Sequence, residues 1–166
     1  MWYVIQVTAS HEQDMIDKCR KVLKDGEEVF TMMTERFERK DGEWKTYRFV
    51  TFRNYIFIDT TDPDDLKIRL HNVIGMTKML GVGDEIIPIR PEEEEFLKRI
   101  GGPDHVIGKA SIYCEGDKIT ITDGPFAGME GMIKWTDKRQ RLVGVKVVFM
   151  NRETEIKLGA DYIKKE

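Results

Sequence analysis

The sequence predicts an α+β fold in which an N-terminal antiparallel sheet with helices is followed by a small C-terminal all-β barrel. Two observations support it. Helical and strand-like patterns alternate over the first hundred residues, whereas only short strands and turns follow Ser111. The chain has 166 residues, which is long enough for a real core. We expect a first domain over residues 1–100, a linker over 101–110 and the barrel over 111–166.

The first elements are a buried strand and an amphipathic helix. Trp2–Val7 is an apolar, β-branched and aromatic run that is typical of a strand. Ser10 with Gln13 forms a capping box that predicts a helix start, and Gly26 is expected to close the helix. Its apolar face contains Met15, Ile16, Cys19, Val22 and Leu23.

A hairpin and a further strand come next. The runs Glu28–Phe37 and Trp44–Phe52 have strand composition, and Asp41-Gly42 between them favours a type I′ turn, which needs positive φ at both positions. Tyr55–Asp59 is another strand.

Two more helices complete the first domain. Asp62-Pro63 is a cap followed by proline at the first helical position, and Pro91 opens the third helix. The second helix carries the stripe Leu66, Leu70 and Val73 and is expected to end at Gly75, before short strands at Met76–Leu80 and Glu85–Ile89. Gly101-Gly102-Pro103 ends the third helix. The barrel strands are expected at Lys118–Ile121, Gly131–Trp135, Leu142–Phe149, Glu153–Leu158 and Tyr162–Lys164.

The charge distribution differs between the two parts of the chain. The net charge of −3 excludes a uniformly basic nucleic-acid-binding coat. Residues 1–108 carry 16 basic and 21 acidic side chains, a net of −5, whereas residues 109–166 carry 11 and 9, a net of +2. This asymmetry indicates two different partners.

Several function classes are excluded at this stage. The sequence contains no GxSxG, HExxH, P-loop or GxGxxG motif, so we expect no enzyme, no cofactor and no metal site. Cys19 and Cys114 lie far apart and indicate unpaired thiols in a reducing cytoplasm. No signal peptide and no apolar run of membrane-spanning length is present, so we expect a cytoplasmic monomer without membrane contact.

Two segments are candidates for binding. Lys134–Arg141 is a basic loop that could neutralise phosphates, with Trp135 either stacking on a base or packing on the barrel; a solvated hairpin loop is the alternative. The second segment is Arg48–Ile58, in which Phe52 and Tyr55 bracket two polar residues. Its aromatic side chains either pack in the core or form an exposed apolar depression for a protein partner.

Three stretches resemble the NusG family. WYVIQV, RFVTFRNYIFID and GDKITITDGPFAGMEGMIKWTD occur in the order and spacing of its NGN and KOW domains, over essentially the whole chain. The chain departs from the family at Phe52-Arg53-Asn54-Tyr55, where Phe-Pro-Gly-Tyr is usual. This departure argues against the tight Pro-Gly turn and indicates a specialised paralogue.

The resemblance implies a bacterial transcription elongation factor. Its NGN domain would bind the clamp helices of RNA polymerase, with Phe52 and Tyr55 in the docking region and Trp2 and Tyr3 on the adjoining strand. Holding the clamp closed would suppress pausing and termination.

The KOW domain determines the subtype. In the LoaP branch of specialised antiterminators the resemblance implies a nascent RNA hairpin as partner, and the RNA-binding candidates are Lys109, Lys138, Arg139, Arg141 and Arg152. The alternative is a housekeeping NusG whose KOW domain recruits Rho or a small-subunit ribosomal protein. A third possibility is a KOW-type RNA-binding or ribosome-associated protein that does not bind polymerase.

Overall fold

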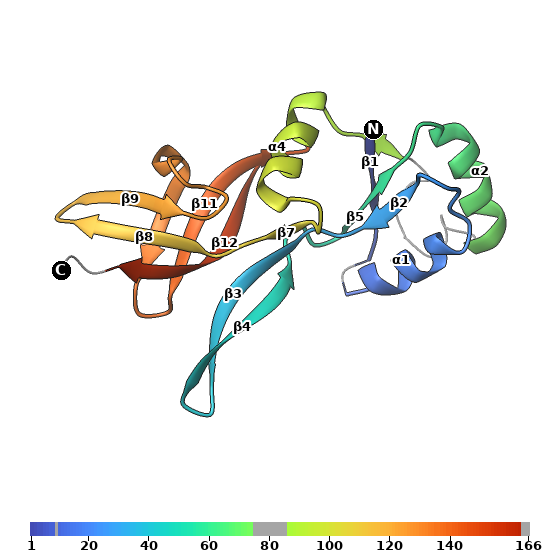
Figure 1. Cartoon of the computed structure of the whole chain (residues 1–166). Helices are drawn as coiled ribbons and strands as arrows, with labels where there is room; N and C mark the ends of the chain where they lie inside the picture. The colour runs from blue at the N-terminus through green and yellow to red at the C-terminus, as the bar shows by residue number, and fades with distance from the viewer. Residues whose placement is uncertain (9, 75–85, 164–166) are drawn as a thin grey trace. The chain divides into compact units, whose positions relative to one another are not determined.

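The chain forms two compact units in the computed structural model, which describes residues 1–8, 10–74 and 86–163 (Figure 1). Unit 1 comprises Met1–Met32 and Phe52–Glu94, and unit 2 comprises Met33–Thr51 and Glu95–Glu166. The predicted fold class is confirmed, since unit 1 holds an antiparallel sheet with helices and the C-terminal sheet of unit 2 curls as a half-barrel. In the described part of the chain, no helix combines the length and the apolar character needed to cross a membrane.

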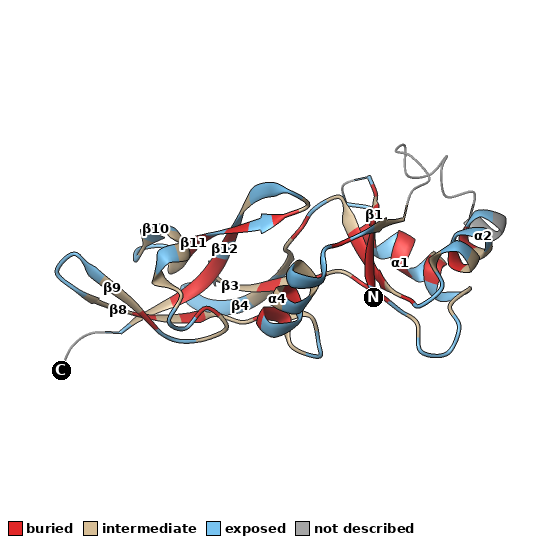
Figure 2. Ribbon diagram, turned by 90° about the horizontal axis from the view of Figure 1, so that it is seen from above, coloured by how far each residue is buried: buried red, intermediate tan, exposed pale blue. Residues whose placement is uncertain are grey.

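Unit 1 is built on a four-stranded antiparallel sheet with the order β2-β5-β1-β6. These strands are β1 (Trp2–Gln6), β2 (Glu28–Phe30), β5 (Tyr55–Asp59) and β6 (Ile87–Pro88). Helices α1 (Glu12–Arg20) and α2 (Pro63–Ile74) bury their apolar stripes against it. The shared core contains Ile5, Val7, Met15, Ile16, Cys19, Val29, Ile56, Ile58, Leu66 and Leu70. Figure 2 shows the buried residues along β1 and α1.

The alternate residues of the same strands form an aromatic cluster. Trp2 meets Phe30 edge-on with ring centroids 4.8 Å apart, and Phe30 stacks on Phe57 at 5.4 Å. Phe52 joins the cluster at 6.1 Å from Phe57. Because successive strand residues point to opposite faces, Trp2 and Ile5 contribute to different layers of unit 1.

Unit 2 contains two sheets. The β3–β4 hairpin is the long two-stranded ribbon of Figure 1, and β7 pairs with β3 in parallel. The half-barrel has the order β10-β11-β12-β8-β9. The bounds are β3 (Met33–Lys40), β4 (Glu43–Val50), β7 (Val106–Ile107), β8 (Ala110–Glu115), β9 (Lys118–Asp123), the 3₁₀ turn η1 (Glu130–Met132), β10 (Ile133–Asp137), β11 (Leu142–Phe149) and β12 (Arg152–Ile163). Helix α4 (Pro91–Gly101) spans the boundary between the units in the sequence.

The predicted start of α1 is wrong. The helix begins at Glu12 with His11 as its N-cap and without a side-chain cap bond, because Ser10 takes a φ of +70°. Gln13 donates instead to Asp17 within the helix. The helix also ends at Arg20, before the expected Gly26, and Val22 and Leu23 pack on the core from beyond its end.

The second helix starts as predicted. The Asp65 backbone N–H donates to Asp62 Oδ1 at 3.2 Å, which is the expected cap, and Leu66 and Leu70 are buried. Val73 lies in α2, but its side chain is outside the described part of the structure, as are Gly75, the expected strand Met76–Leu80 and Glu85 at the start of Glu85–Ile89.

Two turns show how local conformation follows from residue type. Asp41 and Gly42 have φ of +53° and +80°, which confirms the predicted type I′ hairpin turn. Asn54 has φ of +74°, so the chain still makes a tight turn where the family usually has Pro-Gly. The expectation that this turn is lost is therefore wrong, and the Val7 N–H donates to the Asn54 carbonyl at 2.7 Å.

In unit 2 the strand predictions missed three features. Short β7 lies in the segment expected to be a linker, and β8 starts at Ala110, where no strand was expected. The two expected runs after Glu153 are one continuous strand, β12. Gly159 and Ala160 interrupt the apolar pattern from which the strands were predicted, yet both are buried. Here burial results from close packing against neighbouring elements and not from the alternation of side chains between the two faces of the strand.

A partly buried ion pair ties α2 to the chain before β2. The Arg69 guanidinium donates to both carboxylate oxygens of Glu27, at 2.8 and 2.9 Å, and to the Val22 carbonyl. These hydrogen bonds hold the pKa of Glu27 at about 2, below its ordinary value of 4.5. The side chains of Arg69 and Glu27 are 18% and 9% exposed, so water screens the ion pair incompletely.

This pair predicts acid sensitivity of unit 1. A carboxylate with a lowered folded-state pKa stabilises the fold fully above its unfolded-state value, and the contribution is lost as the pH falls from about 4.5 through about 2. In urea unfolding followed by circular dichroism, Glu27→Gln should show a lower midpoint at pH 7 and a flatter fall across this window. Asp25→Asn, at an exposed position in the same turn, should behave like the parent protein. Equal pH dependence in parent and Glu27→Gln proteins would contradict the assignment.

Candidate nucleic-acid interface

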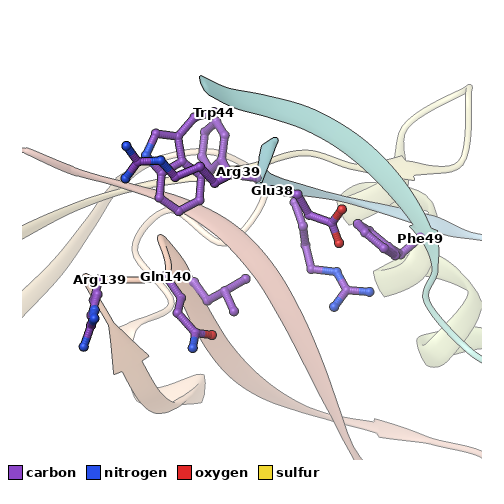
Figure 3. A pocket seen from close by; sticks show the side chains of 9 residues that line it. Glu38, Arg39, Trp44, Phe49, Arg139 and Gln140 are labelled. Atoms are coloured by element: carbon purple, nitrogen blue, oxygen red, sulfur yellow. The ribbon is translucent and has the colours of Figure 1, made fainter. Parts of the chain in front are cut away.

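A cleft of about 490 Å³ lies in unit 2 between the β3–β4 hairpin and the turn that joins β10 to β11 (Figure 3). The hairpin contributes two arginines, Arg36 and Arg39, and three aromatic rings, those of Phe37, Trp44 and Phe49, together with Glu38. The turn contributes Arg139 and Gln140, and Leu142 follows at the start of β11. The lining therefore alternates cationic and aromatic groups, which suits an anionic ligand with flat rings.

The cleft exists because β3 lies directly against β12. A Cβ added at Gly159 would come within 3.0 Å of the Arg36 Cα and 3.1 Å of the Glu35 carbonyl oxygen. A larger residue at this position would require the hairpin backbone or the Lys109 side chain to shift by a few tenths of an ångström, since Cβ contacts this short are uncommon in proteins. Gly159 therefore favours the close approach of the hairpin to the half-barrel.

Arg141 links the half-barrel to the β3–β4 hairpin, which forms one side of the cleft. Its guanidinium lies 4.0 Å from the Phe37 ring centroid and 5.3 Å from that of Trp44, and it forms an ion pair with Asp161. The residue ends the β10–β11 turn with φ of +55°. The ion pair with Asp161 orients the cation, and the two aromatic rings attract it by cation–π interactions.

Lys109 makes a second contact of the same kind. Its ammonium group lies 4.7 Å from the Phe37 ring centroid and donates to Thr46 Oγ1 at 3.0 Å. Lys109 and Arg141 thus meet at Phe37 although they are far apart in the sequence.

The turn between β10 and β11 is fixed by its own hydrogen bonds. The Gln140 N–H donates to Asp137 Oδ1 at 3.0 Å, and the Tyr162 hydroxyl donates to the Leu142 carbonyl while accepting from the Asp137 N–H. Burial raises the pKa of this tyrosine, so it stays a donor. The turn presents Lys138 and Arg139 as exposed cations.

Four of the five RNA-binding candidates lie close to the cleft, and one does not. Arg139 lines it, Arg141 and Lys109 contact its aromatic wall, and Lys138 is in the same turn. Arg152 follows the turn at the other end of β11, which is about 23 Å long at the usual rise per residue. The structure therefore separates Arg152 from the group, and all five roles remain predictions.

Trp135, for which stacking on a base was one option, packs on the barrel. Its indole lies against Gly144, and its Nε1 donates to Glu155 Oε1 at 2.7 Å. Sequence reasoning instead missed Arg36, Phe37, Arg39, Trp44 and Phe49. A signal was present in the sequence, because arginines alternate with aromatic residues along a predicted hairpin.

The residues predicted to bind polymerase are in unit 1. Trp2, Tyr3 and Phe52 are buried, at 2%, 9% and 3% exposure, whereas Tyr55 is half-buried. Trp2 and Phe52 belong to the aromatic cluster described above. Of these four side chains, Tyr55 has the most surface left for a partner, and polymerase binding stays a prediction for all of them.

Comparison with known proteins supplies independent information. The family model described as transcription termination factor NusG matches residues 1–98, more than half of the chain. The transcription termination/antitermination proteins NusG of Thermus thermophilus and Borreliella burgdorferi are 23% and 24% identical, and each match covers 99% of this chain and 97% of the relative. The names describe transcription factors and no enzyme.

A solved structure shares the fold. A structure described as domain interaction in Thermotoga maritima NusG matches with a TM-score of 0.53 and 18% identity, covering 95% of this chain and 92% of the other. At this identity the match supports the fold alone.

The contacts of Arg141 predict that this residue stabilises the β3–β4 hairpin. Arg141→Ala removes the cation from Phe37 and Trp44, and such contacts contribute about 1 kcal/mol. Amide hydrogens of residues 36–47 should therefore exchange about fivefold faster in hydrogen–deuterium exchange. Arg139→Ala is the matched control in the same turn and should leave these rates unchanged. Unaltered exchange in Arg141→Ala would show that the hairpin is held by other contacts.

Proposed function

Because the chain belongs to the NusG family of transcription termination and antitermination factors, we propose that it binds elongating RNA polymerase with one domain and a nascent RNA hairpin with the other. The RNA part is carried by one observation, the turn of exposed Lys138 and Arg139 beside a cleft of arginines and aromatic rings. Cations of this kind neutralise phosphates, and aromatic rings stack on bases.

The polymerase part rests on the family. An NGN domain over residues 1–100 binds the clamp helices of the large polymerase subunit, and a KOW domain over 111–166 binds the RNA. The mechanism is binding alone: the factor shifts the clamp towards its closed state only by the difference in its affinity for the closed and open states. Pausing and termination, which need the open state, become less frequent.

The subtype follows from the partner of the KOW domain. RNA binding corresponds to a LoaP-type antiterminator that acts on particular transcripts. A housekeeping NusG would use the same domain to recruit Rho or a small-subunit ribosomal protein. The grouping of arginine and aromatic side chains supports RNA, because cations around one cleft can neutralise phosphates while the aromatic rings stack on bases.

The RNA part can be tested by salt dependence. Lys138→Ala with Arg139→Ala should weaken binding of a hairpin RNA to the full chain and reduce the slope of log affinity against log salt by about 2, one for each phosphate contact. Fluorescence anisotropy across a potassium chloride series measures both. Lys118→Ala, which removes an exposed cation outside the cleft lining and outside the β10–β11 turn, is the control.

Two results would contradict RNA binding. One is an absence of hairpin binding at low salt, and the other is a slope that the double substitution leaves unchanged. Capture of Rho or of the ribosomal protein by the same chain, without RNA binding, would support the housekeeping alternative.

The polymerase part can be tested at Tyr55. Tyr55→Ala should weaken binding to core polymerase about tenfold or more, since aromatic side chains are common hot spots of interfaces, with little change in thermal stability. Phe52→Ala should instead lower stability by about 3 kcal/mol or more, because its ring is buried in the aromatic cluster. Biolayer interferometry with immobilised polymerase and thermal unfolding separate the two effects. Thr61→Ala is an exposed control in the same unit. Full polymerase binding by Tyr55→Ala would remove Tyr55 from the interface and favour a factor that binds RNA alone.

A further inference from the structure

We propose that the cleft of unit 2 binds unpaired loop nucleotides of the RNA hairpin, and that the β3–β4 hairpin supplies the surface on which the bases stack. This inference rests on the proposed function and deepens it. It makes the RNA site composite, since the hairpin lies outside the KOW sequence to which RNA binding was assigned.

The size of the cleft suits this ligand. Its volume of about 490 Å³ falls in the range of pockets that hold small organic molecules, which are of the size of a nucleotide. It is bordered by the β10–β11 turn on one side and by the hairpin on the other, as Figure 3 shows. A nucleotide that enters therefore contacts both.

The aromatic side chains are not equally available. The Phe37 ring is covered by the cations of Lys109 and Arg141, and the Phe49 ring by Arg36, whose guanidinium lies 3.7 Å from the centroid. Trp44 is 37% exposed. A base therefore stacks on Trp44, and the nearby Arg141 guanidinium, 5.3 Å from the Trp44 ring, adds a second flat cationic surface.

The polar side chains of the cleft suit the rest of a nucleotide. Arg39 and Arg139 lie on the two walls and can take phosphates. Gln140 offers both a donor and an acceptor, and the Glu38 carboxylate accepts only. Glu38 repels phosphate, so it belongs to the base side of the ligand, where it favours bases with an exocyclic amino group.

These features select unpaired nucleotides over a stem. The bases of an A-form helix are stacked on one another and its major groove is too narrow for side chains, so an aromatic wall has no access to them. A base in a loop is free to turn out and stack. Lys138, which is in the turn outside the cleft lining, is then left for the phosphates of the stem.

The experiment compares two RNAs with the same stem, one closed by a loop of randomised nucleotides and one by a polyethylene glycol linker. Anisotropy with the full chain should show about tenfold tighter binding of the nucleotide loop, the effect expected of one stacked base. Trp44→Ala should remove this difference and leave the affinity for the linker-closed stem unchanged. Arg48→Ala, an exposed substitution on the same strand and outside the lining, should preserve the difference. Circular dichroism confirms that each variant is folded.

The outcomes distinguish this inference from the proposed function. Equal binding of the two RNAs, with the dependence on Lys138 and Arg139 retained, would overturn the composite site and leave RNA binding by the turn intact. Retention of the loop preference in Trp44→Ala would likewise overturn it. A failure of both RNAs to bind would overturn both proposals. Equal preference for a DNA loop of the same design would show that the cleft takes single strands in general and does not select RNA.

Discussion

The close approach of β3 to β12 at Gly159 is the constraint on which the chemistry of unit 2 depends. β12 is paired on both sides, antiparallel to β11 and parallel to β8, so its path is fixed by two ladders. A larger side chain at Gly159 would require the neighbouring hairpin backbone or the Lys109 side chain to shift by a few tenths of an ångström, so glycine favours the close approach of the hairpin to this strand. From this contact follow the position of Phe37 over Lys109 and Arg141, and the width of the cleft beside Trp44.

The same constraint changes the meaning of the charge distribution. Divided along the sequence, the chain has an acidic part up to residue 108 and a slightly basic part after it. The fold instead places Arg36 and Arg39, from the acidic part, in one cleft with Arg139 from the basic part. An anionic ligand responds mainly to the charges within about one Debye length of its site. The fold therefore creates a basic site that the net charges of residues 1–108 and 109–166 do not reveal.

Local patterns predicted the elements that local physics determines. The Asp41-Gly42 turn, the Asp62 cap and the short apolar run of β5 each depend on neighbours in the sequence, and each is found. The start of α1, the continuity of β12 and the pairing of β7 with β3 depend on distant contacts, and each was missed. The residues of the site also fall into a group that was predicted and a group that was not. The turn Lys138–Arg141 was recognisable as a cluster, whereas the aromatic wall opposite it comes from a segment a hundred residues earlier. No periodicity within either segment indicates that they meet.

The departure from the family at Arg53-Asn54 carries less weight than its appearance in the sequence indicates. Asparagine tolerates the left-handed conformation better than other residues with a Cβ, and Asn54 adopts it at φ of +74°. Its carbonyl accepts from Val7, and its N–H lies 3.4 Å from Glu12 Oε1, so the turn is tied to β1 and to α1. A backbone that can be made by either Pro-Gly or Arg-Asn does not separate a specialised factor from a housekeeping one. Under the proposed function that distinction depends on the cleft instead, because the two classes would differ in what the second domain binds and not in the turn of the first.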